Sequence, residues 1–204
     1  EQLVGVGRPQ RRDDRLRIAL MPGSRRHEVG DLLPPMLQAI DILRKERDVE
    51  AYVILAPTIE HDEIESIMRK TGISVPILPH DRGEALAAAD VALSSSGTAT
   101  LESAVLGTPV VVMYLLSRIT YWLARRLVKV PHFSLVNIVA GKNVVPELIQ
   151  SEVNGARIAQ EVRTIMEPAN YARLREELAI VRERLGEAGA SQRAAEEIYG
   201  IMTA

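Results

Sequence analysis

Two short segments, far apart in the sequence, carry residue types suited to holding a phosphate group. The more informative one, Ser94–Thr98, consists of small residues between an apolar run and a helical pattern. Because Ser96, Gly97 and Thr98 add little bulk, backbone N–H groups at the helix start can approach an anion, which the helix dipole also favours. Glu102 follows about one helical turn later, a height at which a carboxylate can accept hydrogen bonds from ribose hydroxyls. The alternative is an ordinary strand-to-helix turn with Ser or Thr as N-cap.

The second segment is the turn Pro22–Arg26, which follows the first strongly apolar run. Ser24 and the backbone of the turn can meet an anion there, while the guanidinium of Arg25 offers the fixed, forked positive charge that suits a diphosphate. A solvated basic turn paired with Glu28 or Asp31 is the alternative. Neither segment has the Gly-Lys-Ser/Thr ending of a Walker loop or the strict Gly-x-Gly-x-x-Gly fingerprint, so ATP hydrolysis and NAD binding both lose support.

The elements that must position these turns alternate between strands and helices. The expected strands are Leu16–Met21, Ala51–Ala56, Val75–Leu78, Val91–Leu93 and Pro109–Tyr114, with helices near 28–45, 60–70 and 82–88 and another from about Thr98. This alternation predicts an α/β fold, a Rossmann-like doubly wound parallel sheet with helices on both faces. Ligands of such sheets bind beyond the carboxyl ends of the strands, where both turns are expected to lie.

The chain divides into three expected parts. Residues 1–15 are polar, basic and broken by glycine and proline, which is typical of a linker or edge segment. Residues 16–150 form the Rossmann-like domain, and residues 151–204 form a helical tail that packs on it. The apolar stripe of the tail is expected at Ile158, Val162, Ile165, Leu174, Leu178 and Val181, with breaks at Pro168 and at Gly186–Gly189.

Composition excludes several classes of protein. The 204 residues are 47% hydrophobic with a formal net charge of −2, so the chain can bury a core and has no bulk preference for nucleic acid. The absence of cysteine excludes disulfides and thiolate metal sites. We expect no structural metal, because the four histidines lack the paired spacing that zinc needs: His27, His61, His80 and His132. We also expect no cofactor. No apolar run approaches the roughly 20 residues of a membrane span, and the N-terminus lacks a signal-peptide pattern.

One window is both basic and aromatic. Residues 103–146 contain no Asp or Glu, yet they hold five of the Lys and Arg residues and four of the seven aromatic residues. A helix over 118–129 is expected to present a surface made by Trp122, Arg125, Arg126 and Lys129. Such a surface suits acyl chains and anionic headgroups, so we expect peripheral attachment to the cytoplasmic leaflet of a membrane. A core helix, or a helix buried against another subunit, is the alternative.

Five blocks in the same order resemble the C-terminal half of the lipid-A-disaccharide synthase family, glycosyltransferase family 19. They are Leu20–Val29, Ser96–Glu102, Pro109–Tyr114, Trp122–Lys129, and Ser134–Gly141 with Val145–Gln150. The resemblance covers nearly the whole chain. It implies the GT-B plan, in which two Rossmann-like domains face each other across a cleft, and it makes residues 16–150 the UDP-sugar-binding domain.

The resemblance also implies an activity. The family transfers 2,3-diacylglucosamine from UDP to 2,3-diacylglucosamine 1-phosphate (lipid X), which yields lipid A disaccharide 1-phosphate and UDP with inversion. This chain would be the half that binds the donor, UDP-2,3-diacylglucosamine, while lipid X would bind mainly through an N-terminal domain missing from it. The implied location is cytoplasmic and peripheral on the cytoplasmic face of the inner membrane, with a homodimer as an open possibility.

Carried over residue by residue, the resemblance assigns the candidate site. It places Ser24 and Arg25 at the diphosphate, Ser96, Gly97 and Thr98 at the helix terminus that faces it, Glu102 at the ribose, and Asn137, Glu147 and Gln150 near the donor sugar or the uridine. Val136 stands where the family commonly has proline.

No catalytic base is assigned in this chain, because the resemblance implies that the base lies on the missing domain. Asp90 and His80 are better explained as cap or loop residues. Arg25 and the helix N-terminus can stabilise the charge on departing UDP without a metal, in agreement with the lack of an Asp-x-Asp motif. Two alternatives stay open: an enzyme like the UDP-sugar 2-epimerases, which needs acid–base residues on both domains, and a non-catalytic nucleotide-sugar binding module.

Overall fold

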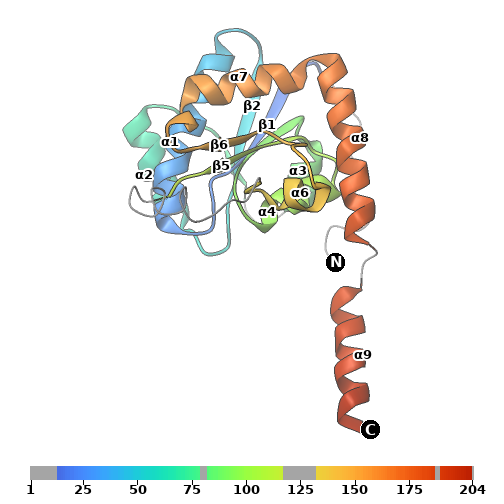
Figure 1. The fold of residues 1–204 in the computed structure, drawn as a ribbon. Coiled ribbons are helices and arrows are strands. Elements are labelled where there is room, and N and C mark those ends of the chain that lie inside the picture. The colour runs from blue at the N-terminus through green and yellow to red at the C-terminus, as the bar shows by residue number, and fades with distance from the viewer. Residues whose placement is uncertain (1–12, 79–81, 117–131, 187–188, 204) are drawn as a thin grey trace.

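The computed structural model of this chain describes residues 13–78, 82–116, 132–186 and 189–203. Within these residues a single sheet has the strand order β3-β2-β1-β4-β5-β6, and every neighbouring pair is parallel. The strands are β1 (Leu16–Met21), β2 (Val49–Ile54), β3 (Ile77–Leu78), β4 (Val91–Ser95), β5 (Val110–Tyr114) and β6 (Glu147–Ile149). Figure 1 shows this sheet at the centre of the molecule.

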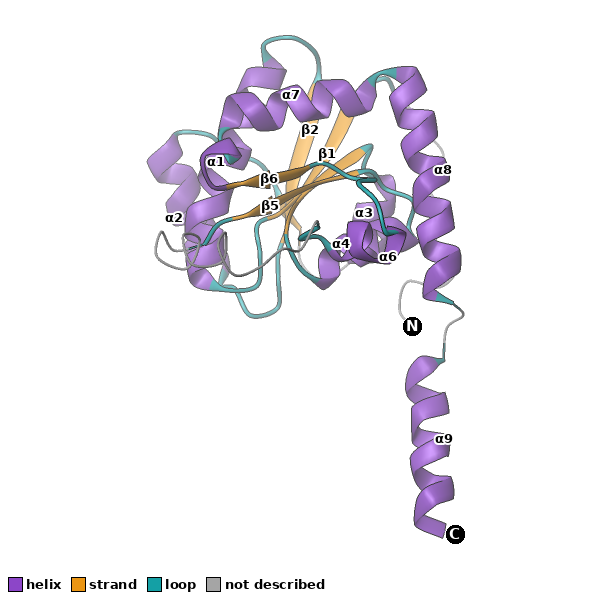
Figure 2. Ribbon diagram, viewed as in Figure 1, coloured by secondary structure: helices purple, strands orange, loops and turns teal. Residues whose placement is uncertain are grey.

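Helices cover both faces of the sheet (Figure 2), as the doubly wound prediction requires. The helices are α1 (Arg26–Arg44), α2 (His61–Thr71), α3 (Arg82–Ala88), α4 (Thr98–Val105), α6 (Leu135–Ala140), α7 (Gly155–Met166), α8 (Pro168–Leu185) and α9 (Ala190–Thr203). Helices α1, α2 and α7 pack together on one face, and α3, α4 and α6 on the other. Helix α8 runs from α7 to α4 and α6, so it joins the two layers.

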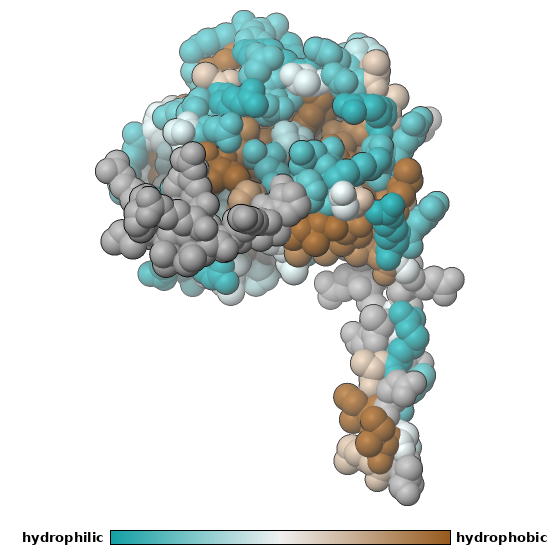
Figure 3. Space-filling view, viewed as in Figure 1, coloured by the Kyte–Doolittle hydropathy of each residue, from teal (hydrophilic) through white to brown (hydrophobic). Residues whose placement is uncertain are grey.

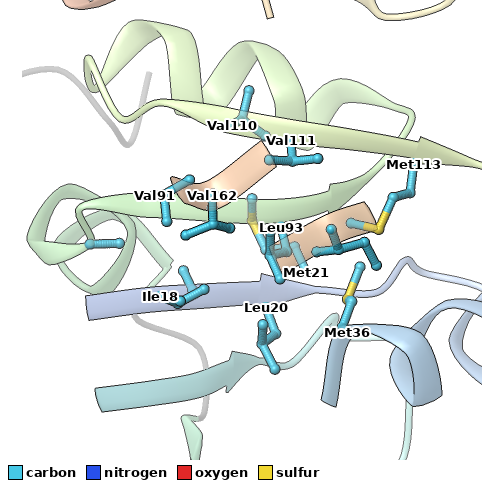
Figure 4. Packing of buried hydrophobic residues seen from close by; sticks show 14 of the residues in the cluster. Ile18, Leu20, Met21, Met36, Val91, Leu93, Val110, Val111, Met113 and Val162 are labelled. Atoms are coloured by element: carbon cyan, nitrogen blue, oxygen red, sulfur yellow. The ribbon is translucent and has the colours of Figure 1, made fainter. Parts of the chain in front are cut away.

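The core lies on both sides of β1, β4 and β5. Because helices cover both faces, these strands are continuous apolar runs rather than alternating ones. Ile18, Leu93 and Val111 are fully buried. Figure 4 shows the strand residues of this cluster together with Met36 of α1 and Val162 of α7. Burial of each large apolar side chain contributes about 1.5–3 kcal/mol, which is what holds the carboxyl ends of the strands in place.

The helical tail has the apolar stripe that the sequence predicts, with all six residues buried. Helix α7 approaches α1 so closely that a Cβ added to Gly155 would lie 2.6 Å from Cβ of Gln38. Helix α9 extends beyond the end of α8, away from the sheet (Figure 1), and Figure 3 shows apolar side chains gathered toward its C-terminal end. None of the described helices combines the length and the apolar character needed to cross a bilayer.

Several element boundaries differ from the sequence-based expectation. Strand β2 begins and ends two residues earlier than predicted, because Val49 already pairs with Leu16 of β1. Strand β4 continues through Ser95, since Ser94 and Ser95 pair with β5. Strand β3 is only two residues long, and it follows Pro76, which has no N–H to donate. Strand β6 and helix α6 were not expected at all.

Candidate functional site

The two predicted turns emerge side by side because β1 and β4 are neighbours. Met21, the last residue of β1, pairs with Ser94 of β4. The chain leaves β1 toward β2 on one side and continues from β4 toward β5 on the other, so this is the point at which the strand order reverses. Ligands of doubly wound sheets bind in the crevice beyond the strands at such a point.

A cavity of about 320 Å³ lies at this place and is lined by both turns. Its described lining includes six of the predicted site residues: Ser24, Arg25, Ser96, Gly97, Thr98 and Glu102. Met21, Ile54 and Ala56 form an apolar wall at the strand ends. Its volume falls at the lower end of the range for small-molecule sites. Residues that are about seventy positions apart in the sequence therefore share one concave surface.

Glu28 and Thr58 hold the first turn in shape. Gly23 has a φ of +126°, and a Cβ added there would lie 2.5 Å from the Glu28 carboxylate, so only glycine fits. The Thr58 hydroxyl donates to the Ser24 carbonyl at 2.6 Å. The Glu28 carboxylate accepts from the Ser24 N–H at 3.3 Å and from Arg25 at 2.6 Å. Of the two ion-pair partners considered for the basic turn, Glu28 and Asp31, the structure pairs it with Glu28. The turn also lines the cavity.

The second turn leaves helix N–H groups open beside the cavity. Gly97 is the N-cap of α4 and no side chain caps the helix, so the Ser or Thr N-cap of the alternative interpretation is not what the structure has. The first N–H groups of a helix have no intrahelical acceptor. Space around Gly97 is open, because no atom lies within 4 Å of a Cβ built there. The N–H groups of Ser96 and Thr100 are already bonded, to the carbonyls of Met113 and Gly97, so they are not among the open donors.

Glu102 projects from α4 and lines the same cavity. Its side chain is half-buried. No residue in the described part of the chain donates a hydrogen bond to this carboxylate. The Glu102 oxygens can therefore accept hydrogen bonds from a ligand without breaking a hydrogen bond to any residue that the structure describes.

Asn137 and Glu147 are outside the described lining of this cavity and instead form a buried network. Asn137 is fully buried and donates to the Val145 carbonyl at 2.9 Å and to Glu147 at 2.8 Å. Its amide oxygen accepts from the N–H groups of Val144 and Val145 at 2.7 and 2.9 Å. All four hydrogen bonds that this amide can make are used within the protein.

Glu147 in turn positions the segment before α6. Its carboxylate accepts from the N–H groups of Phe133 and Ser134 at 2.9 and 2.8 Å. The Phe133 carbonyl accepts from the Ser96 hydroxyl at 3.1 Å, which joins this segment to the second turn. Val136 is the second residue of α6, where a backbone N–H has no intrahelical partner, so the helix begins without the proline.

Gln150 also makes its contacts within the protein. It has a φ of +54°, and its amide pairs with the backbone of Leu116 in both directions, accepting at 2.7 Å and donating at 3.0 Å. These hydrogen bonds join the chain that follows β5 to the residue that follows β6, just beyond the last strand pair. Like Asn137 and Glu147, Gln150 shapes the backbone beside the cavity.

The remaining candidates lie elsewhere. Asp90 is 4% exposed and accepts a hydrogen bond from the Arg17 N–H. It lies at the amino ends of the strands, whereas the cavity lies at their carboxyl ends. Trp122, Arg125, Arg126, Lys129 and His80 are outside the described residues. Ligand atoms of His61, Asp62 and Glu65 lie within 4.8 Å of one another on α2. Glu65 is also paired with Arg69, as expected for an ordinary surface charge cluster.

The sequence alone does not identify Glu28 as part of the cavity wall. It also does not identify Phe133 as a residue that lies beside the cavity. The sequence identifies Glu28 only as an ion-pair partner of the basic turn. Its spacing from Gly23 carries the missing signal, since a residue early in α1 can reach back to the turn that precedes the helix. No comparable signal existed for Phe133, whose position depends on Glu147 and Ser96.

Solved structures identify the class of fold. WaaG, a glycosyltransferase involved in lipopolysaccharide biosynthesis, superimposes with a TM-score of 0.60 and 17% identity over 93% of this chain and 48% of its own. Staphylococcus aureus MnaA, in a co-structure with UDP, gives a TM-score of 0.61 and 16% identity over 93% of this chain and 46% of its own. The parallel sheet with its switch-point cavity is thus the Rossmann-like fold of a GT-B glycosyltransferase domain.

Sequence comparison then identifies the family. The profile of the lipid-A-disaccharide synthetase family matches residues 9–198. Lipid-A-disaccharide synthase of Myxococcus xanthus is 45% identical over 91% of this chain and 49% of its own length. That of Syntrophus aciditrophicus is 43% identical over 90% of this chain and 49% of its own. The chain belongs to the lipid-A-disaccharide synthetase family, and it spans about half the length of the curated relatives it matches.

Proposed function

We propose that this chain is the donor-binding half of a lipid-A-disaccharide synthase. In this proposal it binds UDP-2,3-diacylglucosamine, whose sugar is transferred with inversion to lipid X. The observation that carries the proposal is the meeting of the Arg25 turn and the Gly97 turn in one cavity at the switch point of the sheet. Family membership supplies the reaction, and the co-structure of MnaA with UDP supports nucleotide binding by this fold.

The diphosphate would lie between the two turns. Open N–H groups at the start of α4 would donate to it, and the Arg25 guanidinium would pair with its other side. The Glu102 carboxylate would accept hydrogen bonds from the ribose hydroxyls. As the bond between sugar and diphosphate breaks, negative charge accumulates on UDP. Donors held in place by the fold stabilise that charge without reorganising, which is how this half would contribute to the rate.

We assign the acceptor site and the base for the attacking hydroxyl to the half of the protein that the relatives have and this chain does not. The substrates carry acyl chains, so the proposal places the protein peripherally on the cytoplasmic face of the inner membrane. The acid-free basic window at 103–146 supports that placement, because anionic lipids attract such segments.

Calorimetric titration with UDP tests the donor site directly. Arg25→Ala and Glu102→Ala should each weaken binding by about 1–3 kcal/mol, the value of a hydrogen bond to a charged group. Arg26→Ala is the matched control, because Arg26 is the adjacent arginine, pairs with Glu63 and is not part of the described lining. Unchanged UDP affinity in both site variants would contradict the proposal.

Product analysis separates the proposal from an epimerase. The likeness to the solved structures named above is one of fold alone, at 16–17% identity, whereas the synthase relatives reach 45%. With UDP-2,3-diacylglucosamine and lipid X, a synthase releases UDP and forms a disaccharide. An epimerase would return an altered UDP-sugar without releasing UDP, and a binding module would do neither.

A further inference from the structure

A second cavity of about 760 Å³ adjoins the first. The two share Arg25, Glu28, Ser95 and Ser96, so they meet at the residues proposed to surround the diphosphate. The second cavity extends past the carboxyl end of β5, toward Leu116. It is more than twice as large as the first, and neither the nucleotide nor the diphosphate is assigned to it.

The walls of this cavity are of two kinds. On one side α1 contributes polar groups, including His27 and Asp31. On the other side are the apolar side chains of Met113, Leu115 and Leu116 with Phe133 and Ile138. The first cavity, in contrast, is lined mainly by small and polar residues around its phosphate-facing turns.

Phe133 and Ile138 are large apolar residues left open to solvent, 40% and 49% exposed. Single exposed apolar residues are common on protein surfaces. Here two of them, one before α6 and one within it, line the same concave space and continue into the apolar end of β5. An apolar ligand that covers both would remove this surface from water.

The apolar wall is held in place before any ligand binds. The Phe133 N–H donates to Glu147 at 2.9 Å, and its carbonyl accepts from the Ser96 hydroxyl at 3.1 Å. Ser134, the N-cap of α6, fixes the start of the helix that carries Ile138. A preformed wall favours affinity, because little ordering is needed on binding.

We infer that this second cavity holds an acyl chain of the donor sugar, an inference that rests on the proposed function. The sugar is attached directly to the diphosphate, so its 2- and 3-substituents begin within the space that shares Arg25 and Ser96. The hydroxyl groups of the sugar face His27 and Asp31, and an acyl chain lies along Phe133 and Ile138. Residues of this half would thereby select an acylated donor over a plain UDP-sugar.

Affinity as a function of acyl length tests this. Donor analogues with acyl chains from acetyl to octanoyl are titrated against the protein below their micelle concentrations, and UDP alone is titrated in parallel. Each methylene buried in the cavity should raise affinity by up to about fourfold. Ile138→Gln should flatten that rise, costing about tenfold for the octanoyl donor, and leave UDP affinity unchanged. Phe133→Ser gives the same test from a separate segment.

Ile180→Gln is the matched control, because Ile180 is a helical isoleucine of similar exposure, 44%, on α8 and away from both cavities. It should leave both measurements as in the wild type. An affinity that does not depend on acyl length, or one to which Ile138→Gln and Phe133→Ser make no difference, would overturn the inference while UDP binding still supports the proposed function. Loss of UDP binding in the wild type would overturn both.

Discussion

The Arg25 guanidinium lies 2.6 Å from the Glu28 carboxylate, which also accepts a hydrogen bond from the Ser24 N–H at 3.3 Å. Two donors that we assign to the diphosphate thus already have an anionic partner from the protein. A carboxylate and a phosphate compete for such donors. The Arg25 side chain is 69% exposed, so its pair with Glu28 is weak and a diphosphate with more charge can displace it.

Glu28→Gln should therefore strengthen UDP binding. The change keeps the size of the side chain and removes the competing charge, and the gain should reach about fivefold at most, the value of an exposed ion pair. Titration calorimetry measures it. Glu63→Gln is the control, because Glu63 forms a similar pair with the neighbouring Arg26 outside the described cavity lining. Weaker UDP binding by Glu28→Gln would mean that Glu28 orients Arg25 rather than competing for it.

The two glycines of the site should respond differently to alanine. Gly23→Ala forces a Cβ against Glu28 at a φ of +126°, so it should destabilise the fold by about 1–3 kcal/mol and abolish UDP binding. Gly97 has extended backbone and open space around its Cβ position, so Gly97→Ala should leave the free energy of unfolding within a few tenths of a kcal/mol. Its methyl group would nevertheless face the cavity and weaken UDP binding. Urea denaturation and calorimetry on both variants measure the two effects, and equal loss of stability would contradict this distinction.

Asn137→Ala should lower stability by about 2–4 kcal/mol. The variant leaves the N–H groups of Val144 and Val145 without their acceptor and removes one donor from Glu147, in a network that is buried at Val145 and partly buried at Val144 and Glu147. Urea denaturation measures the loss. Asn143→Ala, at an exposed asparagine, should cost less than about 0.5 kcal/mol. If Asn137→Ala unfolded as the wild type does and lost only donor affinity, Asn137 would be a ligand contact.

Whether the bounds of a strand can be predicted from the sequence depends on whether local or long-range interactions determine them. The bounds of β1 are predicted correctly, since a buried apolar run stopped by Pro22 is a local signal. Ser94 and Ser95 have no such signal, and they join β4 because β5 supplies hydrogen bonds. Strand β6 has three residues, too few for a period, and it exists through its pairing with β5.

The residues of the site also fall into two groups: those that the local sequence identifies, and those whose positions depend on tertiary packing. The Arg25 and Gly97 turns are recognisable because small residues, a charge and a following helix occur together in the sequence. That they line one cavity follows from the adjacency of β1 and β4, a regularity of doubly wound sheets. The network of Asn137 and Glu147 is not predictable in this way, because each partner is fixed by the final packing of α6 against β6.

The basic helix expected over 118–129 stays a sequence-based prediction. Replacing Arg125, Arg126 and Lys129 by Gln should reduce sedimentation of the protein with anionic liposomes, because each basic residue near a charged bilayer contributes about 1 kcal/mol. Arg173→Gln, Arg175→Gln and Arg182→Gln together remove equal charge from α8 and serve as the control. Equal binding by all three proteins would rule out this membrane surface.

A pH-dependent ion pair ties α7 to the end of α1. The Arg163 guanidinium donates to Glu46 with Nε at 2.9 Å and with a second bond from Nη2, and this hydrogen bonding lowers the pKa of Glu46 below its usual 4.5. A lowered pKa in the folded state means that the pair stabilises fully above about pH 4.5 and loses its contribution as the pH falls further. Arg163→Gln should thus be slightly less stable than the wild type at neutral pH and equal to it at low pH. Urea denaturation between pH 3 and pH 7 measures the difference, with Lys45→Gln, whose side chain pairs with Asp41 at 2.7 Å, as a surface control. A difference that grew as the pH fell would have the wrong sign for a lowered Glu46 pKa.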